Sequence, residues 1–273
     1  MPNTLIPNLP NAEYHSHPAI SNSRLSRFVS SPRLLDVPMK PTAALRWGTL
    51  VHTALLEPDL FVQTVVAMPE GLDKGTGAKA RVAEFEAANA GKEVIDSAEA
   101  ASLQAVLKRV REDEFAMDLL GAPGRTEQSL FWTDAQTGIE LRCRPDYWRD
   151  DGIVVDVKTT ADCSSYQFGK SALDFGYDRQ AAIYWDGIEA ITGKAPTAFV
   201  FIAIEHSKTS GETYVQCHNV EAETMMRGRE RYRKALADLK MCREKYGMES
   251  ARYPHTLEAS IRPLRVPYHF LNQ

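Results

Sequence analysis

Two stretches that lie ten residues apart carry most of the information on fold and function, Arg144-Pro145-Asp146 and Asp156-Val157-Lys158. The β-branched run over 152–158 predicts a strand. Side chains two residues apart on a strand point to the same side, so Asp156 and Lys158 project together. Two carboxylates and a backbone carbonyl are hard oxygen ligands that suit Mg²⁺ or Mn²⁺, and an adjacent amine can orient a water or stabilise charge on a phosphoryl group. Taken alone, the pattern also fits a turn aspartate followed by a solvated strand end.

The surrounding sequence predicts a sheet with helices packed around it. Residues 127–133 and 139–144 read as two strands, and the turn-rich segment between them makes them a hairpin. A helix over 177–191 separates the strand at 152–158 from a buried, apolar strand at 198–204, and 213–218 alternates like an edge strand. This order predicts an α/β fold with a mixed central sheet.

Helices are expected in the first and last parts of the chain. The helix-forming segments are 20–29, 43–57 (ended by Pro58), an exposed helix after a loop within 70–92, 97–120 and 221–246. We expect one domain over 1–273. In it, about 1–120 is mainly helical and carries His52, about 121–220 holds the catalytic sheet and helix, and 221–273 forms a C-terminal helix and tail.

Composition narrows the class of protein. The chain has 273 residues, of which 44% are hydrophobic and 25% charged, enough for a buried core and unlike a disordered chain. No long apolar window or signal peptide stands out, and the four cysteines form no CxxC pair, so we expect a reduced cytoplasmic protein without a membrane anchor. The net charge of −4 means that a polyanionic partner has to be met by a local patch or a metal.

Two further residues are candidates for the metal site. His52 lies on the otherwise apolar side of its predicted helix. It is either a core histidine with a satisfied hydrogen bond or, if it reaches the carboxylates, a metal ligand. Glu127 opens the first strand of the predicted hairpin and is either a third carboxylate or an exposed strand end.

One helix face follows the site in sequence. Gln180 and Tyr184 are four residues apart on the predicted helix and therefore share a face. Together with Tyr177 and Arg179, this face is suited to contact a phosphate backbone or a terminal base, although the pattern also fits a half-buried helix.

Taken together, these motifs resemble the PD-(D/E)xK nuclease superfamily, and its RecB-type branch with a trailing Gln-x-x-x-Tyr. The closer resemblance is to the nuclease domain of the RecE family (exonuclease VIII) of phages and prophages. It is carried by Tyr14-His15, 48–58, 142–146, 156–162 and 196–201, which follow the family's order over nearly the whole chain. The resemblance implies a restriction-endonuclease-like core, with a mixed central sheet flanked by helices and a helical N-terminal segment.

For function, the resemblance implies a Mg²⁺-dependent exonuclease, with Mn²⁺ as a substitute. It would degrade linear double-stranded DNA from the 5′ end and leave a 3′ single strand for recombination with a RecT-like annealing protein. It also implies a homo-oligomeric ring around the DNA. Carried over by motif, the metal ligands are Asp146, Asp156, His52 and the carbonyl of Val157. Lys158 is the catalytic lysine, Gln180 and Tyr184 position the scissile strand, and Glu127 is an extra carboxylate.

Some RecB-type nucleases hold an iron–sulfur cluster, and the sequence argues against one here. Ser31 stands where a cluster cysteine lies in those enzymes, and no C-terminal trio of cysteines follows. We therefore expect no iron–sulfur cluster.

Basic residues outside the motifs supply candidates for DNA contacts. Those for a 5′-phosphate are Arg24, Arg27, Arg142 and Arg144. The basic helix over 221–246 is expected to be a solvated face, or else to line a DNA channel. Two other functions remain open on the same core: a structure-specific or restriction-like endonuclease, and a DNA-binding protein without catalysis.

Overall fold

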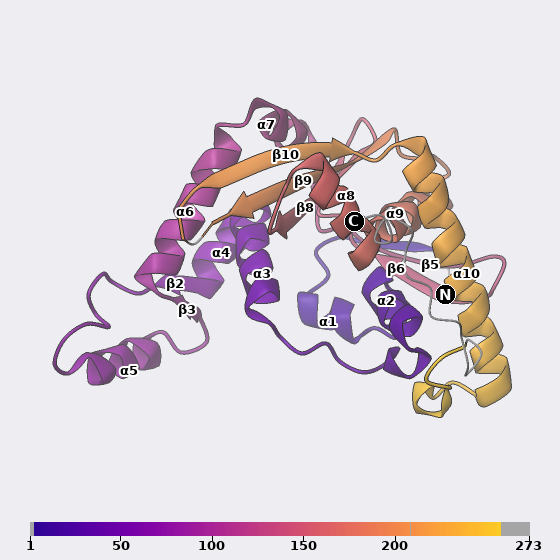
Figure 1. The fold of residues 1–273 in the computed structure, drawn as a ribbon, viewed down its shortest axis with the longest axis horizontal. Coiled ribbons are helices and arrows are strands. Elements are labelled where there is room, and N and C mark those ends of the chain that lie inside the picture. Colours follow the sequence, from indigo (N-terminus) through magenta and orange to yellow (C-terminus); the bar gives the residue numbers. More distant parts are fainter. Residues whose placement is uncertain (1–2, 208, 258–273) are drawn as a thin grey trace, which may run out of the picture.

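A five-stranded mixed sheet forms the centre of the protein, as seen in a computed structural model that describes residues 3–207 and 209–257 (Figure 1). The strand order is β10-β9-β8-β7-β4. The two central strands, β8 (Ile153–Thr160) and β9 (Ala198–His206), are parallel and paired from Ile153 with Ala198 to Thr160 with Glu205. The other pairs are antiparallel and involve β10 (Thr213–Asn219), β7 (Tyr147–Arg149) and β4 (Gly124–Thr126). The predicted mixed α/β sheet is confirmed.

Parallel strands need a long crossover, and two consecutive helices supply it between β8 and β9. These are α8 (Ser165–Phe175) and α9 (Tyr177–Thr192), joined only by Gly176. The backbone of Gly176 has φ +74°, a left-handed conformation that glycine adopts without strain.

The predicted hairpin forms, but in a second sheet. It consists of β5 (Ser129–Thr133) and β6 (Glu140–Cys143), and β5 also pairs with β1 (Thr4–Ile6). The edge of the central sheet is instead made by β7 and β4, two three-residue strands that the sequence reading did not predict. After β6 the chain leaves the small sheet through 144–146 and enters the central one, which puts Asp146 between the two sheets.

Helices cover both faces of the central sheet, and the alternation along β8 decides which residues each face receives. Val155 and Val157 pack in one core with α3 (Ala43–Leu56) and α6 (Ser97–Arg111). Val154 packs in the other core with α9, on which α10 (Ala222–Tyr246) lies (Figure 1). Asp156 and Lys158 lie two and four residues after Val154 on the strand, so they point to the same face as Val154, toward α9.

Several helix boundaries differ from the expected ones. The helix predicted over 97–120 is two helices, α6 and α7 (Glu114–Gly121), because the side chain of Asp113 accepts a hydrogen bond from Ala116 N (3.1 Å) and starts α7. Pro58 follows α3 as expected, but it also occupies the first turn of a new helix, α4 (Pro58–Thr64). The remaining elements are the α-helices α1 (Asn11–Ser16) and α2 (Asn22–Ser30) and the short 3-10 helices η1 (Pro32–Leu34) and η2 (Ser250–Arg252).

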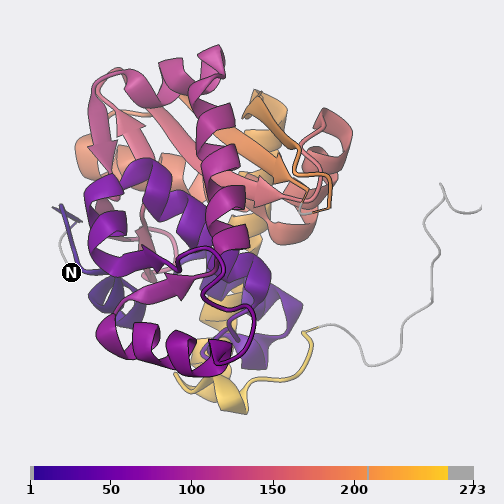
Figure 2. The same cartoon turned by 90° about the vertical axis from the view of Figure 1, so that its left-hand side faces the viewer.

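An arm projects from the layered body. Its base is the parallel pair β2 (Val65–Ala67) and β3 (Glu93–Ile95), and its tip is α5 (Ala78–Ala88), which buries none of its residues. Figures 1 and 2 both show α5 standing apart from the central sheet. The expected loop and exposed helix within 70–92 are confirmed. The predicted tail beyond 257 lies outside the described residues. Within the described part of the chain, no helix has both the length and the hydrophobicity needed to cross a lipid bilayer.

Candidate active site

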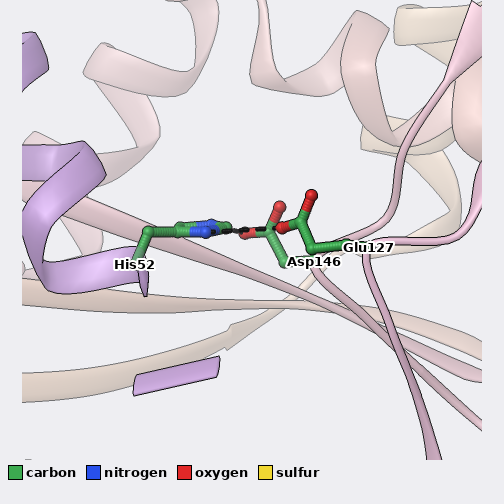
Figure 3. Close-up of side chains that lie close together, drawn as sticks. All are labelled: His52, Glu127 and Asp146. Atoms are coloured by element: carbon green, nitrogen blue, oxygen red, sulfur yellow. Dashed lines mark hydrogen bonds and ion pairs between the residues drawn. The ribbon is translucent and has the colours of Figure 1, made fainter. Parts of the chain in front are cut away.

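Three side chains from distant parts of the sequence converge beside the central sheet (Figure 3). His52 comes from α3, Asp146 from the link between β6 and β7, and Glu127 from the loop before β5. His52 Nε2 is hydrogen-bonded to Asp146 Oδ2, and His52 Nδ1 lies 3.5 Å from Glu127 Oε1. One potential ligand atom from each residue lies within 4.8 Å of the others. His52 is therefore not an ordinary core histidine, because both its ring nitrogens face carboxylates.

A second cluster lies next to the first along β8. The carboxylate of Asp156 is fully buried, and its two oxygens have different partners: Oδ1 pairs with the amine of Lys158, and Oδ2 accepts a hydrogen bond from Gln180 Nε2. The backbone N–H of Val157 joins the clusters by donating to Asp146 Oδ2 at 2.7 Å. Seven residues predicted from separated motifs thus form one continuous network: His52, Glu127, Asp146, Asp156, Val157, Lys158 and Gln180.

Glu127 is held in an unusual backbone conformation. The sequence reading made it the first residue of a strand, which is wrong, because β5 begins at Ser129. Glu127 instead has φ +50°, one of two non-glycine residues with positive φ in the described chain. Its N–H donates to Asp146 O (3.2 Å), and its Oε2 lies 3.8 Å from Arg144. Such conformations cost energy and concentrate at functional sites.

Burial and like charge perturb the acids of this network strongly. Burial raises the pKa of Glu127 to about 8, and the adjacent Asp146 carboxylate adds to the rise. Burial and the charge of Asp146 raise the pKa of Asp156 to about 6, against the opposing effect of Lys158. Burial would also raise the pKa of Asp146, but His52 and Lys158 keep it below its usual value.

The basic groups respond in the opposite sense. Burial alone would lower the pKa of His52, but the carboxylates of Asp146 and Glu127 outweigh it and raise the pKa to about 9. Burial alone would also lower the pKa of Lys158. The charges of Asp156 and Asp146 outweigh this effect and raise the pKa above its usual value. The carboxylates of the network carry more negative charge than the Lys158 amine and the His52 imidazole can neutralise. The raised pKa values of Glu127 and Asp156 express this excess of negative charge.

This donor set fits a divalent cation. Carboxylate oxygens are typical ligands of Mg²⁺ and Mn²⁺, whereas an imidazole nitrogen suits transition-metal cations. The raised pKa of Glu127 and Asp156 reflects acids crowded together in a buried place, and a bound cation would relieve that repulsion.

One acid near the site was missed by sequence reasoning. Glu57, the residue directly after α3, lies close enough to Glu127 for its charge to raise the pKa of that group. The available signal was its position five residues after His52, directly before the helix-ending Pro58.

Tyr184 lies one turn after Gln180 on α9, as its spacing predicts. Its ring packs edge-on against Phe199 with the ring centres 6.1 Å apart. Burial holds the pKa of the Tyr184 hydroxyl well above its usual range. Its role in positioning a DNA strand stays a prediction.

Two of the four predicted phosphate-binding arginines are buried and hold the N-terminal segment. Arg142 is only 3% exposed and Arg144 only 8%. Both guanidinium groups also lie over the ring of Tyr14, at 4.7 and 4.0 Å from its centre. Their hydrogen-bond acceptors are the carbonyls of Tyr14, His15, His17 and Leu9, the hydroxyl of Ser129 and the side chain of Asn11.

The other two arginines also make internal contacts. Arg24 pairs with Asp36, and Arg27 donates to the carbonyls of Leu34 and Leu35. These contacts fix α2 to the turn that follows it. Binding of a 5′-phosphate by any of the four arginines stays a prediction.

The basic C-terminal helix matches the expected solvated face only in part, because Arg227 and Lys234 are exposed but three other arginines are half-buried. These three arginines form ion pairs with acids on neighbouring elements. Arg229 pairs with Asp186, and Arg231 pairs with Asp178. Arg233 pairs with both Asp134 and Asp186. The charge pattern of α10 thus serves its packing against α9 and the β5–β6 hairpin.

Comparison with known proteins agrees with this geometry. Residues 32–250 match the family described as "PDDEXK-like domain of unknown function (DUF3799)". The chain belongs to this family. The predicted PD-(D/E)xK nuclease fold is thereby confirmed.

One of the similar solved structures supports the same fold. A protein from Eubacterium rectale named "Putative exonuclease" superposes with a TM-score of 0.57 at 14% identity, over 93% of this chain and 96% of that one. An alkaline exonuclease (LHK-Exo) from Laribacter hongkongensis is 14% identical over 73% of this chain and 94% of its own, with a TM-score of only 0.30. No protein of curated function matches the sequence.

Proposed function

We propose that the protein is a divalent-metal-dependent exonuclease that degrades linear double-stranded DNA from the 5′ end. The observation that carries this proposal is the network of His52, Asp146, Asp156 and Lys158, joined through the N–H of Val157. Chance proximity does not account for it, because each residue comes from a motif predicted to act in phosphodiester hydrolysis.

Each residue has a distinct task in this proposal. The cation would be held by Asp146, Asp156, His52 and the carbonyl of Val157, with Glu127 as an extra carboxylate. When bound, it would supply Lewis acidity at the phosphoryl oxygens. Lys158 carries its charge beside Asp156 and is positioned to orient the attacking water or to stabilise charge that develops on the phosphate.

Gln180 keeps Asp156 in place from the side of α9. It is buried, and its amide donates to the oxygen that Lys158 does not use. Tyr184, one turn further on, is proposed to position the scissile strand together with Gln180.

The finer parts of the proposal rest on the resemblance to the RecE family. They are the 5′→3′ polarity, the 3′ single-stranded product, Mg²⁺ as the cation and a RecT-like annealing partner in recombination. A homo-oligomeric ring around the DNA and a place in the reducing cytoplasm belong to the same proposal.

The test compares a linear duplex with a covalently closed circle of the same sequence, with and without Mg²⁺. We expect mononucleotides to be released from the linear DNA only, and a label at the 5′ end to be released before one at the 3′ end. Cleavage of the circle would indicate an endonuclease instead, and binding without cleavage would indicate a non-catalytic DNA-binding protein.

Two variants test the site itself. We expect Asp156→Ala and Lys158→Ala to abolish cleavage while the protein stays folded by circular dichroism. Lys108→Ala is the matched control, because this lysine is 76% exposed and, within the described part of the chain, its ion pair is with Glu112, the residue directly after α6. A near-normal rate in either site variant would refute the assignment.

A further inference from the structure

A pair of aromatic side chains lies beside the amine of Lys158. Tyr177 is the nearer ring, with its centre 5.1 Å from Lys158 Nζ, and Phe175 lies next to it with ring centres 5.8 Å apart. Phe175 is 63% exposed, whereas Tyr177 is half-buried. The pair therefore runs from the catalytic lysine outward to solvent.

The pair continues a row of rings that starts in the core. The Tyr177 ring contacts Phe168 and Phe201 at 5.9 and 5.7 Å between centres, and both of these phenylalanines are buried. Phe201 also lies 5.8 Å from Lys158 Nζ. Tyr177 is thus backed by packed side chains and cannot swing freely, so the outer ring rests on a rigid base.

The backbone that carries the pair is also fixed. Phe175 ends α8 and Tyr177 begins α9, with only Gly176 between them. The carbonyl of Gly176 accepts a hydrogen bond from Asn22 Nδ2 (3.3 Å). A β-carbon at Gly176 would lie 2.3 Å from the guanidinium of Arg179, which itself donates to Ser26 Oγ at 2.6 Å. Helix α2, from a distant part of the chain, therefore fixes the junction between α8 and α9 through these two hydrogen bonds.

We propose that Phe175 and Tyr177 form a stacking platform for a base of the DNA strand that is cut at Lys158. This inference rests on the proposed nuclease function. The occupant follows from continuity: a phosphate held at Lys158 carries its sugar and base with it, and the aromatic surface next to that amine is the Phe175–Tyr177 pair. Stacking on aromatic rings accepts any base, since every base has a π-face.

The role assigned to the pair is positioning rather than catalysis, so the test separates binding from turnover. The binding readout is quenching of 2-aminopurine placed at the first, second or third nucleotide from the 5′ end of a duplex. The duplex carries phosphorothioate linkages at its 5′ ends to prevent cleavage, so that Asp146 and the other proposed metal ligands stay intact during the binding measurement. We expect quenching at one of these positions, and its loss when Phe175→Ala or Phe175→Leu is introduced.

Matched variants show whether the face of the ring matters. Phe175→Trp should restore quenching, whereas Leu, which keeps the apolar bulk, should not. Tyr166→Ala is the control on the same helix. Tyr166 is 80% exposed and lies nine positions before Phe175, about 14 Å away along the helix axis. Quenching should be unchanged in this variant.

In the otherwise wild-type protein, Phe175→Ala should raise KM about 5- to 100-fold with little change in kcat, because stacking holds ground state and transition state alike. If the wild type cleaves DNA but Phe175→Ala matches it in both quenching and KM, the platform is refuted and the nuclease function stands. If the wild type neither cleaves nor binds DNA, the proposed function fails, and the platform fails with it.

Discussion

The protonation of the His52–Glu127–Asp146 group makes a strong prediction for metal binding. In the metal-free protein the pKa of Glu127 is about 8 and that of His52 about 9, while that of Asp146 is lowered. At pH 7 the group therefore holds two protons, one on Glu127 and one on His52. A cation bound by both residues has to displace both protons, so its affinity must rise with pH.

The size of the effect follows from the same values. At 1.36 kcal/mol per pH unit, removing both protons at pH 7 costs about 4 kcal/mol, a loss of about 1,000-fold in affinity. Below pH 8 two protons are displaced, and the affinity should rise about 100-fold per pH unit. Between pH 8 and 9 only the proton on His52 remains, the rise should be about 10-fold, and above that range the curve should flatten.

Isothermal titration calorimetry with Mg²⁺ measures both the affinity and the protons released. The titration is repeated in two buffers of different ionisation enthalpy at several values between about pH 6.5 and 9. The matched variants are His52→Gln and Glu127→Gln, each of which should reduce the release at pH 7 to about one proton. A flat affinity over this range, with less than about half a proton released, would refute metal binding by these two residues.

Two smaller predictions concern the helix that supports the site. Gln180→Leu leaves a buried oxygen of Asp156 without a hydrogen-bond donor. In a nuclease assay we expect duplex cleavage to be about 10- to 100-fold slower. In urea denaturation we expect the free energy of unfolding to be about 1–3 kcal/mol lower. Gly228→Ala puts a β-carbon 2.1 Å from the carbonyl oxygen of Asp178, so we expect at least about 1–3 kcal/mol of destabilisation. The control Gly169→Ala, with open space around it, should be neutral or stabilising in the same denaturation; equal stability of the two alanine variants would refute the close packing of α10 on α9.

The parts of the fold that were predictable are those in which local pattern and tertiary environment agree. The run over 152–158 is buried on both faces of the sheet, so its β-branched residues are visible in the sequence. Strands β4 and β7 are three residues each and too short to show any period. The break after α6 depends on a single capping side chain, Asp113, inside a pattern that otherwise continues.

The sequence predicted which residues form the site better than it predicted the contacts between them. The motifs, and their resemblance to the RecE family, identified His52, Asp146, Asp156 and Lys158, but they gave no sign that Val157 joins the two acids through its N–H. That contact exists because Asp146 follows β6 out of the small sheet and enters the central sheet beside β8, and the presence of two sheets was not visible in the sequence.

The arginines show the physical limit of reading charge from sequence. A guanidinium group counts as a free cation until its acceptors are known, and for Arg142 these are backbone carbonyls of the N-terminal segment, 125 or more residues away. The same holds for Arg231, whose partner Asp178 is buried on a neighbouring helix. Arg144 still places its charge 3.8 Å from Glu127, but its donors are occupied by internal acceptors, so a phosphate at the site would meet Lys158, His52 and a bound cation. The affinity for DNA in this region should therefore depend on the metal far more than the number of arginines in the motifs indicates.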